Sequence, residues 1–484
     1  MKKIIRTIGI ALSLLITSTA CDKDEFLDVN TDPNNPASAP IELVFPAAVI
    51  STAGTVGGQY AILGGIWAQY YTQNNGSNQY KEIDQYNITP STSAFSNRYT
   101  ELYSGALNDY DYVIEQAREA ENWNAYLMAT AMQAYTFQVL TDLYDDIAFD
   151  EALRGDEGIA NPMFRSGEAV YDSLIVRIND ALAKEITAQA VPSLAQADIV
   201  FGGEMTDWVR FANTLKLKIY LRQIYARPDV AEAGLRSLYE GGAEFLAEPA
   251  AVDIFEDRTS ARNPLYEMDQ STALNTNQNL KASETLFNYL VDDEGFRDSV
   301  RLKALYRPAA KGGYKPMEQG TFDLPTTSLD PLTTSRALIE PTAPVYFISE
   351  AESYFLQAEA ALRGFGSASA EELYNQGVEE AYDQLGLERP EGAYEFPVGG
   401  SFEEKLEAII VQKWVALAGT YQGLEAYFEI LRTGYPDFLN YPAGGVTGGV
   451  FPTRLPIPNI VTQRNPNAPQ KAEPITSPVW WDVN

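Results

Sequence analysis

The stretch from residue 125 to residue 141 places the strongest constraint on how this chain folds. It contains no charged residue, and its apolar side chains cover every side of a helix with about 3.6 residues per turn instead of one stripe. These side chains are Leu127, Met128, Ala131, Met132, Ala134, Tyr135, Phe137, Val139 and Leu140. Such a helix must be enclosed by other helices or by lipid. Because its length is marginal for a bilayer and polar residues dilute it, we interpret it as the central helix of a large soluble core.

Carboxylates gather where this apolar pattern ends, at Asp142, Asp145, Asp146, Asp150 and Glu151. We expect them to form a solvated acidic helix end, because carboxylates are mostly exposed in folded proteins. A metal site or an acid/base pair is the alternative interpretation. Asp145 and Glu151 would then be the pair of a carboxylate glycoside hydrolase, which needs two carboxylates roughly 5 to 10 Å apart.

The absence of histidine restricts the chemistry further. Without an imidazole the chain has no Ser-His-Asp or Cys-His pair, no His-ligated zinc or haem, and no near-neutral His acid/base. The single cysteine, Cys21, leaves no disulfide or thiolate cluster within the chain. We therefore expect no enzyme activity, no metal and no cofactor, with carboxylate-only glycoside hydrolysis as the main mechanism left open. The formal net charge of −31 argues against nucleic acid as a partner.

Six motifs follow one another along the chain. They are LYSGALNDYDYVIEQA (102–117), FQVLTDLYDDIAFDEAL (137–153), DWVRFANTLKLKIYLR (207–222), PVYFISEAESYFLQAEAALRG (344–364), IIVQKWVALAGTYQGLEAYFEILRTGYP (409–436) and FPTRLPIPNIVTQRNPN (451–467). In content and order they resemble the SusD/RagB family, the cell-surface nutrient-binding lipoproteins of Bacteroidetes, over nearly the whole chain. The sequence departs from the family pattern at Asp145, where Gly is usual, and at Ala148-Phe149, where Pro-Tyr is usual.

The resemblance implies a fold and a function. The fold is mostly α, with about four tetratricopeptide-like helix pairs packed against a long irregular, loop-rich region as a SusD-like α superhelix, all in one domain over residues 41–484. The function is capture of an oligosaccharide or polysaccharide at the cell surface. The protein would then deliver this glycan to a SusC-like TonB-dependent outer-membrane transporter and act as its lid.

The N-terminus predicts export and lipidation. Lys2, Lys3 and Arg6 precede a short apolar run, which is typical of a signal peptide over residues 1–20. Cys21 follows as the expected lipidated residue, although Ser18 stands where lipoboxes usually have Leu or Val, and an ordinary signal peptide is the alternative. The acidic residues after Cys21 resemble the Bacteroidetes signal for export to the outer face of the outer membrane. Residues 21–40 would be the tether of a domain that is lipid-anchored there and faces the exterior.

Four helix pairs are predicted within residues 99–226 and 346–432. They are 99–121 with the central helix, 168–186 with 207–226, 350–363 with 370–385, and 402–418 with 421–432. Capping boxes start three of these helices, at Ser349/Glu352, Ser369/Glu372 and Ser401/Glu404, and Gly364 and Gly386 stop two. Trp67, Trp208 and Trp414 lie in helical patterns and are assigned to the core. The tail, 433–484, would wrap the helices as irregular coil and be pinned by Trp480 and Trp481.

Residues 252–345 form a long segment rich in Asn, Ser, Thr, Pro and Gly, in which only 283–291 has a helical pattern. Long irregular segments in compact proteins are usually functional surfaces, so the ligand is expected here. Sugar binding needs flat aromatic faces flanked by hydrogen-bonding side chains. The candidates are Asn74, Asn75, Asn78 and Tyr80 in the loop 69–86, the mid-chain residues Tyr306, Tyr314, Phe322 and Arg336, and Tyr394 before the last helix pair.

Three alternatives to glycan capture stay open. The RagB branch of the family suggests the same lid role for peptides, which bind through backbone hydrogen bonds and need no aromatic platform. A carboxylate glycosidase is the second, and a pure tetratricopeptide scaffold without a soluble ligand is the third.

Overall fold

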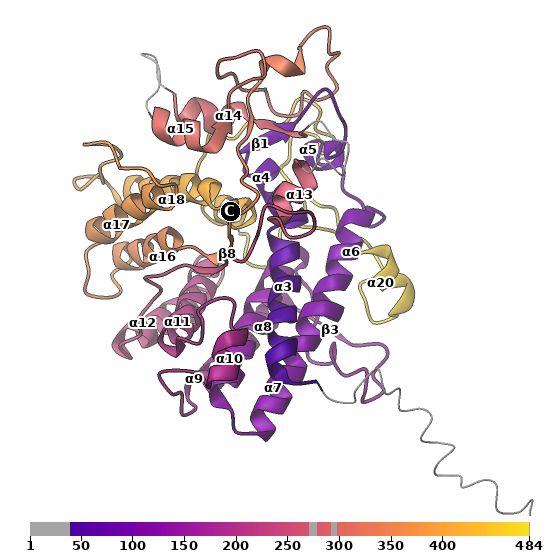
Figure 1. Ribbon diagram of the computed structural model, residues 1–484, viewed down its shortest axis with the longest axis vertical. Helices are drawn as coiled ribbons and strands as arrows, with labels where there is room; N and C mark the ends of the chain where they lie inside the picture. Colours follow the sequence, from indigo (N-terminus) through magenta and orange to yellow (C-terminus); the bar gives the residue numbers. More distant parts are fainter. Residues whose placement is uncertain (1–38, 271–277, 292–297, 484) are drawn as a thin grey trace, which may run out of the picture.

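The structure is a computed structural model that describes residues 39–270, 278–291 and 298–483 (Figure 1). The predicted signal peptide, Cys21 and nearly all of the predicted tether lie outside the described residues. The described chain is mainly helical and its sheets are small, which confirms the predicted fold class.

The predicted central helix is α8 (Trp123–Tyr144), and it is enclosed by other helices. Every side chain from Asn124 to Tyr144 is buried, as the absence of a polar face predicts. The Asn122 side chain caps its start by accepting a hydrogen bond from Ala125 N at 3.3 Å. The surrounding N-terminal helices are α3 (Ile41–Val56), α4 (Gln59–Trp67), α6 (Ser93–Glu101), the π-helix η2 (Leu102–Leu107) and α7 (Asn108–Glu119). In Figure 1, α3, α6, α7 and α8 stand upright beside one another.

The other predicted helix pairs are confirmed, with shifted ends. The helices are α9 (Gly167–Leu182), α11 (Met205–Arg222), α16 (Glu350–Leu362), α17 (Ala370–Asp383), α18 (Phe402–Gly419) and α19 (Gly423–Thr433). The prediction missed α10 (Pro192–Ala197), which lies between α9 and α11 in the sequence, and α12 (Pro228–Glu240), which follows α11 and packs on it. Trp67, Trp208 and Trp414 lie in the core as predicted.

The predicted caps are confirmed with one exception. Full capping boxes start α17 and α18, and Gly364 and Gly386 take left-handed φ values of 89° and 66° after α16 and α17. At α16 the Ser349 side chain does accept from Glu352 N at 3.3 Å. The reciprocal bond is not formed, because the Glu352 carboxylate lies in the core 2.8 Å from Lys218 Nζ.

The segment 252–345 is less irregular than predicted. It contributes three strands to an antiparallel sheet of order β1-β5-β7-β6, made of β1 (Tyr71–Gln73), β5 (Leu280–Ala282), β7 (Arg336–Ala337) and β6 (Tyr306–Arg307). It also contains α13 (Pro264–Asp269), α14 (Glu284–Tyr289), α15 (Ser299–Leu305) and the 3-10 helix η4 (Pro331–Thr333). Strands of two or three residues are too short to show an alternating pattern in the sequence, which is why the prediction missed them.

Further short elements complete the fold. The strands β2 (Ile147–Ala148) and β3 (Phe164–Arg165) pair, as do β4 (Ala250–Val252) and β8 (Val345–Ile348). The loop 69–86 contains α5 (Lys81–Asp84). The tail is mainly coil, as predicted, but forms α20 (Asn459–Arg464). Trp481 is fully buried and donates from Nε1 to Asp142 at 2.9 Å, so the tail is pinned against the end of α8.

The end of α8 is therefore not the solvated acidic end that the sequence predicts. Asp142 is fully buried, accepts a hydrogen bond from the Tyr171 hydroxyl, and lies 3.5 Å from Arg222 Nε. Burial raises the pKa of this carboxyl to about 6. The prediction was wrong because the tail folds back over this helix end. Asp150 is exposed, as expected.

Asp142 belongs to a set of buried charges where α8, α11, α16, α18 and α19 meet. This buried charge cluster comprises Asp142, Lys218, Arg222, Glu352, Glu359, Lys413, Glu425, Glu429 and Arg432. Burial alone would raise the pKa of Glu429, but the cations of Arg432, Lys413 and Arg222 hold it well below its usual range. The cluster joins the central helix to both C-terminal helix pairs through ion pairs.

Helices α4 and α19 pack with backbone against backbone at Gly423. A Cβ placed on Gly423 would lie 2.5 Å from Gly65 N and 2.6 Å from the carbonyl carbon of Gly64. Since these neighbours are backbone atoms, Gly423→Ala is expected to lower the free energy of unfolding by about 1 to 3 kcal/mol. Gly54→Ala in α3 is the matched control, because nothing lies within 4 Å of its added Cβ and alanine favours a helix. Equal urea midpoints for the two variants would contradict this packing.

Candidate functional site

The structure places the nine predicted ligand-binding residues in different environments. Asn74, Asn75, Tyr80, Tyr306 and Phe322 are buried, Tyr314, Arg336 and Tyr394 are half-buried, and Asn78 is exposed. They do not come together in one site, since Tyr394 lines a pocket that none of the other eight lines.

The buried candidates hold the loop 69–86 against the mid-chain segment. Asn75 Nδ2 donates to the carbonyl oxygen of Leu329 at 2.6 Å, and the Tyr80 hydroxyl donates to that of Met268 at 2.7 Å. The hydroxyl of the fully buried Tyr306 donates to the carbonyl oxygen of Tyr70 at 2.8 Å. The loop 69–86 and the mid-chain segment therefore lie against each other, and these polar groups bond to the protein itself.

The half-buried Arg336 lies in β7 and donates to the Gln278 side chain. Burial and the neighbouring Arg307 lower the pKa of its guanidinium, and burial together with Arg336 lowers the pKa of Lys281 to about 8. Arg336 stands opposite Lys281 and Arg307 in the sheet, so three basic residues lie on neighbouring strands.

Tyr80→Phe tests the structural role of one buried candidate. Losing the hydroxyl leaves the Met268 carbonyl without this donor, so the free energy of unfolding is expected to fall by about 1 to 2 kcal/mol. Chemical denaturation measures this, with the exposed Asn78→Ala as the control that changes little. A variant with unchanged stability but weakened glycan binding would instead place Tyr80 in a ligand site.

Tyr394 is held in place by a buried polar network. It has a left-handed φ of 54°, which is rare for a residue with a side chain and is a frequent feature of functional sites. Its hydroxyl donates to Asp298 Oδ2 at 3.2 Å, and the Arg301 guanidinium lies 4.6 Å from the centre of its ring. Asp298 and Arg301 are themselves buried and ion-paired.

The same network reaches a second tyrosine. Arg301 donates to Gln412 Oε1 at 3.2 Å, and Gln412 Nε2 donates to the Tyr289 hydroxyl at 2.7 Å. Asp298 and Gln412 thereby fix the hydroxyl groups of Tyr394 and Tyr289, and Tyr289 is the last residue of α14. Fixed aromatic rings are the preorganised form that ligand binding favours.

Three rings then run nearly parallel. Tyr289 stacks with Tyr394 at 6.2 Å between centroids and 19° between planes, and with Phe438 at 5.7 Å and 12°. The buried Trp414 meets Tyr289 and Phe438 edge-on from α18. Phe438 follows α19 in the tail and is 38% exposed.

These rings line a surface pocket of about 280 Å³, which we call the aromatic pocket. It is lined by Tyr289, Tyr374, Tyr394, Glu395, Glu404, Glu407, Ala408, Val411, Gln412 and Phe438. They come from α14, α17, the loop between α17 and α18, α18 and the tail, whose helices lie in the upper left of Figure 1. The lining combines flat apolar faces with carboxylate and amide oxygens, which is the chemistry that sugar recognition requires.

Most of this pocket was not predicted from the sequence. Tyr289 lies in a short helical pattern and resembles a core residue, and the α18 carboxylates resemble an ordinary solvated helix face. Phe438 had a usable signal, because a large aromatic residue between Pro436 and Pro442 in a coil has few helical neighbours to bury it.

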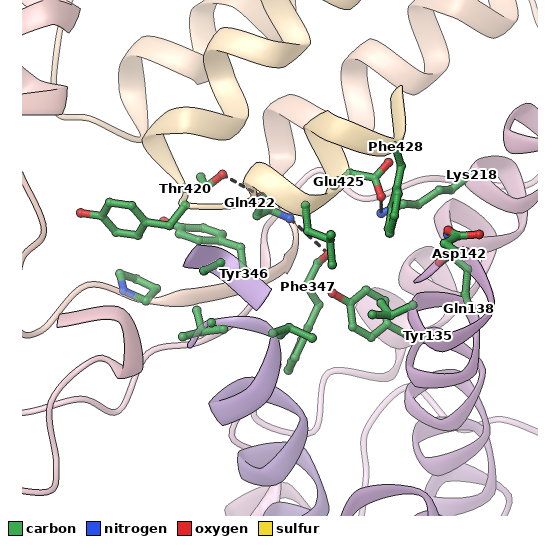
Figure 2. Close-up of a pocket in the computed structure, with 18 of the residues that line it drawn as sticks. Tyr135, Gln138, Asp142, Lys218, Tyr346, Phe347, Thr420, Gln422, Glu425 and Phe428 are labelled. Atoms are coloured by element: carbon green, nitrogen blue, oxygen red, sulfur yellow. Dashed lines mark hydrogen bonds and ion pairs between the residues drawn. The ribbon is translucent and has the colours of Figure 1, made fainter. Parts of the chain in front are cut away.

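Figure 2 shows a second pocket, inside the fold, beside the buried charge cluster. Tyr135, Gln138 and Asp142 of α8 face Glu425 and Phe428 of α19 across it, and Lys218 reaches toward Glu425 at 3.0 Å. Its volume of about 40 Å³ is enough for a few water molecules and too small for a sugar. We assign this cavity to the packing of the core.

The two carboxylates of the glycoside-hydrolase alternative serve the structure of the loops. Asp145 Oδ2 pairs with Arg454 Nη1 at 3.2 Å, and its other oxygen accepts from Trp480 N at 3.1 Å. Glu151 accepts from Met163 N at 2.8 Å.

Comparison with known proteins places this fold in a family. The SusD-like family described as starch-binding associating with outer membrane matches residues 34–458. The chain belongs to this SusD-like family. No curated protein matches the chain.

Solved structures of SusD homologues share its fold. One from Bacteroides uniformis is 21% identical, with 91% of this chain and 99% of that chain covered and a TM-score of 0.73. A chitin-binding protein is 23% identical, with 92% and 99% covered and a TM-score of 0.74. A chitin-binding SusD homologue from Flavobacterium johnsoniae is 20% identical, with 92% and 99% covered and a TM-score of 0.74.

Proposed function

We propose that this SusD-like protein is a surface lipoprotein that captures an oligosaccharide in the aromatic pocket. It is anchored in the outer membrane by lipid on Cys21 and faces the exterior. It delivers the glycan to a SusC-like TonB-dependent transporter and closes over that transporter as a lid. No covalent step takes part.

The observation that carries the glycan proposal is the row of nearly parallel rings of Tyr394, Tyr289 and Phe438. The apolar C–H face of a pyranose packs on such rings, while its hydroxyls bond to neighbouring polar groups. Two of the rings are held by the Asp298–Arg301–Gln412 network, so their side chains lose little conformational entropy when the ligand binds.

The surroundings of the pocket support a sugar in preference to a lipid-like ligand. Glu404 and Glu407 stand beside the rings and offer hydrogen-bond acceptors for hydroxyl groups. The two relatives named as chitin-binding support a glycan as the ligand class. The family description, which associates it with the outer membrane, and the predicted lipidation at Cys21 support the location.

Affinity electrophoresis tests the proposal. The chain without residues 1–21 is run through native gels cast with a panel of neutral, acidic and amino polysaccharides. We expect retardation by at least one glycan and its loss when free oligosaccharide of the same glycan is added. If no polymer and no soluble oligosaccharide binds, glycan capture is wrong. Binding of extended peptides in the same pocket would then favour the peptide alternative.

A further inference from the structure

We propose that the aromatic pocket prefers a positively charged glycan, namely an oligosaccharide of hexosamines with free amino groups. This inference rests on the proposed function and names the substrate class of the same site. Its basis is the combination of aromatic walls with carboxylates that have no cation of their own in the described chain.

Three carboxylates line the pocket. Glu404 and Glu407 are three residues apart in α18 and so lie on one face of that helix, and Glu395 lies in the loop before it. Within the described residues, none of these three carboxylates has an ion pair with a lysine or arginine. The Ser401 amide and hydroxyl donate to Glu404 Oε2 at 2.7 and 2.9 Å, which lowers the pKa of Glu404 and keeps it ionised.

Further negative charge surrounds this part of the protein. The Tyr435 hydroxyl donates to Glu403 Oε2 at 3.3 Å, and burial together with Glu403, Glu407 and Asp437 raises the pKa of this hydroxyl. Lys405 follows Glu404 in α18, but no lysine or arginine lines the pocket in the described chain. The Arg301 guanidinium below Tyr394 is already paired with Asp298.

A sugar ammonium group matches both parts of this lining. It is attracted to the exposed Phe438 ring as well as to the carboxylates. A neutral sugar gains only the stacking and hydrogen bonds, and a uronic acid is repelled. Cation–π and exposed ion-pair contributions together predict a preference of about tenfold for a free amino group over a hydroxyl or an N-acetyl group.

Isothermal titration calorimetry with three hexasaccharides tests this preference, using the chain without residues 1–21. The ligands are a glucosamine, an N-acetylglucosamine and a glucose hexamer of the same linkage, measured at pH 6 in low and high salt. We expect the glucosamine hexamer to bind about tenfold more tightly in low salt, and the difference to shrink in high salt.

Two variants locate the effect. Glu407→Gln removes the charge but keeps one oxygen acceptor, so it is expected to weaken binding of the glucosamine hexamer several-fold more than binding of the glucose hexamer. Glu232→Gln, an exposed carboxylate of α12 outside the pocket, makes the same charge change and should leave the preference intact. Equal loss of preference in both variants would mean that net charge, and not this pocket, attracts the amino sugar, and would overturn the inference.

The remaining outcomes separate the inference from the proposed function. Equal affinities for the three hexamers, with binding retained, overturn the charge preference alone. Binding of none of them, together with no retardation by any polysaccharide, overturns both.

Discussion

Replacing Arg222 by methionine is expected to lower the free energy of unfolding by about 3 to 5 kcal/mol, because it removes one partner of a buried ion-pair network. Arg222 is fully buried and pairs with Glu425 Oε1 at 2.6 Å and Glu429 Oε1 at 2.5 Å. Its Nε lies 3.5 Å from Asp142. Methionine keeps much of the apolar volume between Phe428 and Trp481 but leaves three carboxylates without this cation.

The free energy of unfolding that Arg222→Met loses should be larger at high pH than at low pH. In the native protein, Arg222 and its neighbours hold the pKa of Glu425 and Glu429 below the usual value, and this stabilisation is lost as the pH falls through those lowered values. In the variant the pKa of all three carboxyls rises, because burial is less opposed. A carboxyl group whose pKa is raised in the folded state stabilises the fold at pH values below its pKa in the unfolded state. This stabilisation is lost as the pH rises through the pKa of the group in the folded state. The difference between variant and native protein should therefore be largest near pH 8 and smaller near pH 5.

Urea unfolding followed by circular dichroism at pH 5 and pH 8 measures both effects. Arg98→Met is the matched control, because Arg98 pairs with Glu101 at the surface with 34% and 41% of the side chains exposed. That change should cost only about 0 to 1 kcal/mol at either pH. Similar losses for the two variants, or a loss at Arg222 that does not change with pH, would show that the buried charge cluster does not hold the helices together.

The helical part of the fold could be predicted because its signals are local. The uncharged run of α8, the serine caps of α17 and α18, and the glycines after α16 and α17 each act within a few residues. The π-helical turn η2 inside the first predicted helix and the short strands of the mid-chain sheet have no comparable signal. They depend on neighbours that are distant in the sequence, as in the pairing of Tyr71 with Ala282.

The buried charges and the candidate site were hard to predict for the same reason. Glu425 resembles an ordinary charged residue of a helix, and only the folded chain brings it to Lys218, Arg222 and Lys413. Of the site, Tyr394 was among the predicted residues, as a tyrosine in a loop bounded by glycine and proline before the last helix pair. Tyr289 lies more than a hundred residues before Tyr394 in the sequence, and Phe438 comes from the tail.

Replacing Phe438 by alanine is expected to weaken glycan binding about 10- to 100-fold while the fold stays intact. Phe438 supplies the most exposed of the three parallel rings, and losing a buried aromatic contact with the sugar costs about 1.5 to 3 kcal/mol. The Phe438 side chain is 38% exposed in the free protein. Its removal should therefore change the free energy of unfolding much less than the free energy of glycan binding.

Phe402→Ala is the matched control for this prediction. Phe402 starts α18, is 39% exposed and does not line the aromatic pocket, so both variants remove the same side chain from similar exposure. Titration of the glycan that retards the native protein gives the dissociation constant for each variant, and urea unfolding gives their stability. A tenfold or greater loss at Phe438 with none at Phe402 assigns the sugar face to this ring. Equal affinities in both variants would place the glycan elsewhere, and the half-buried Tyr314 and Arg336, near the sheet, would then be the next residues to change.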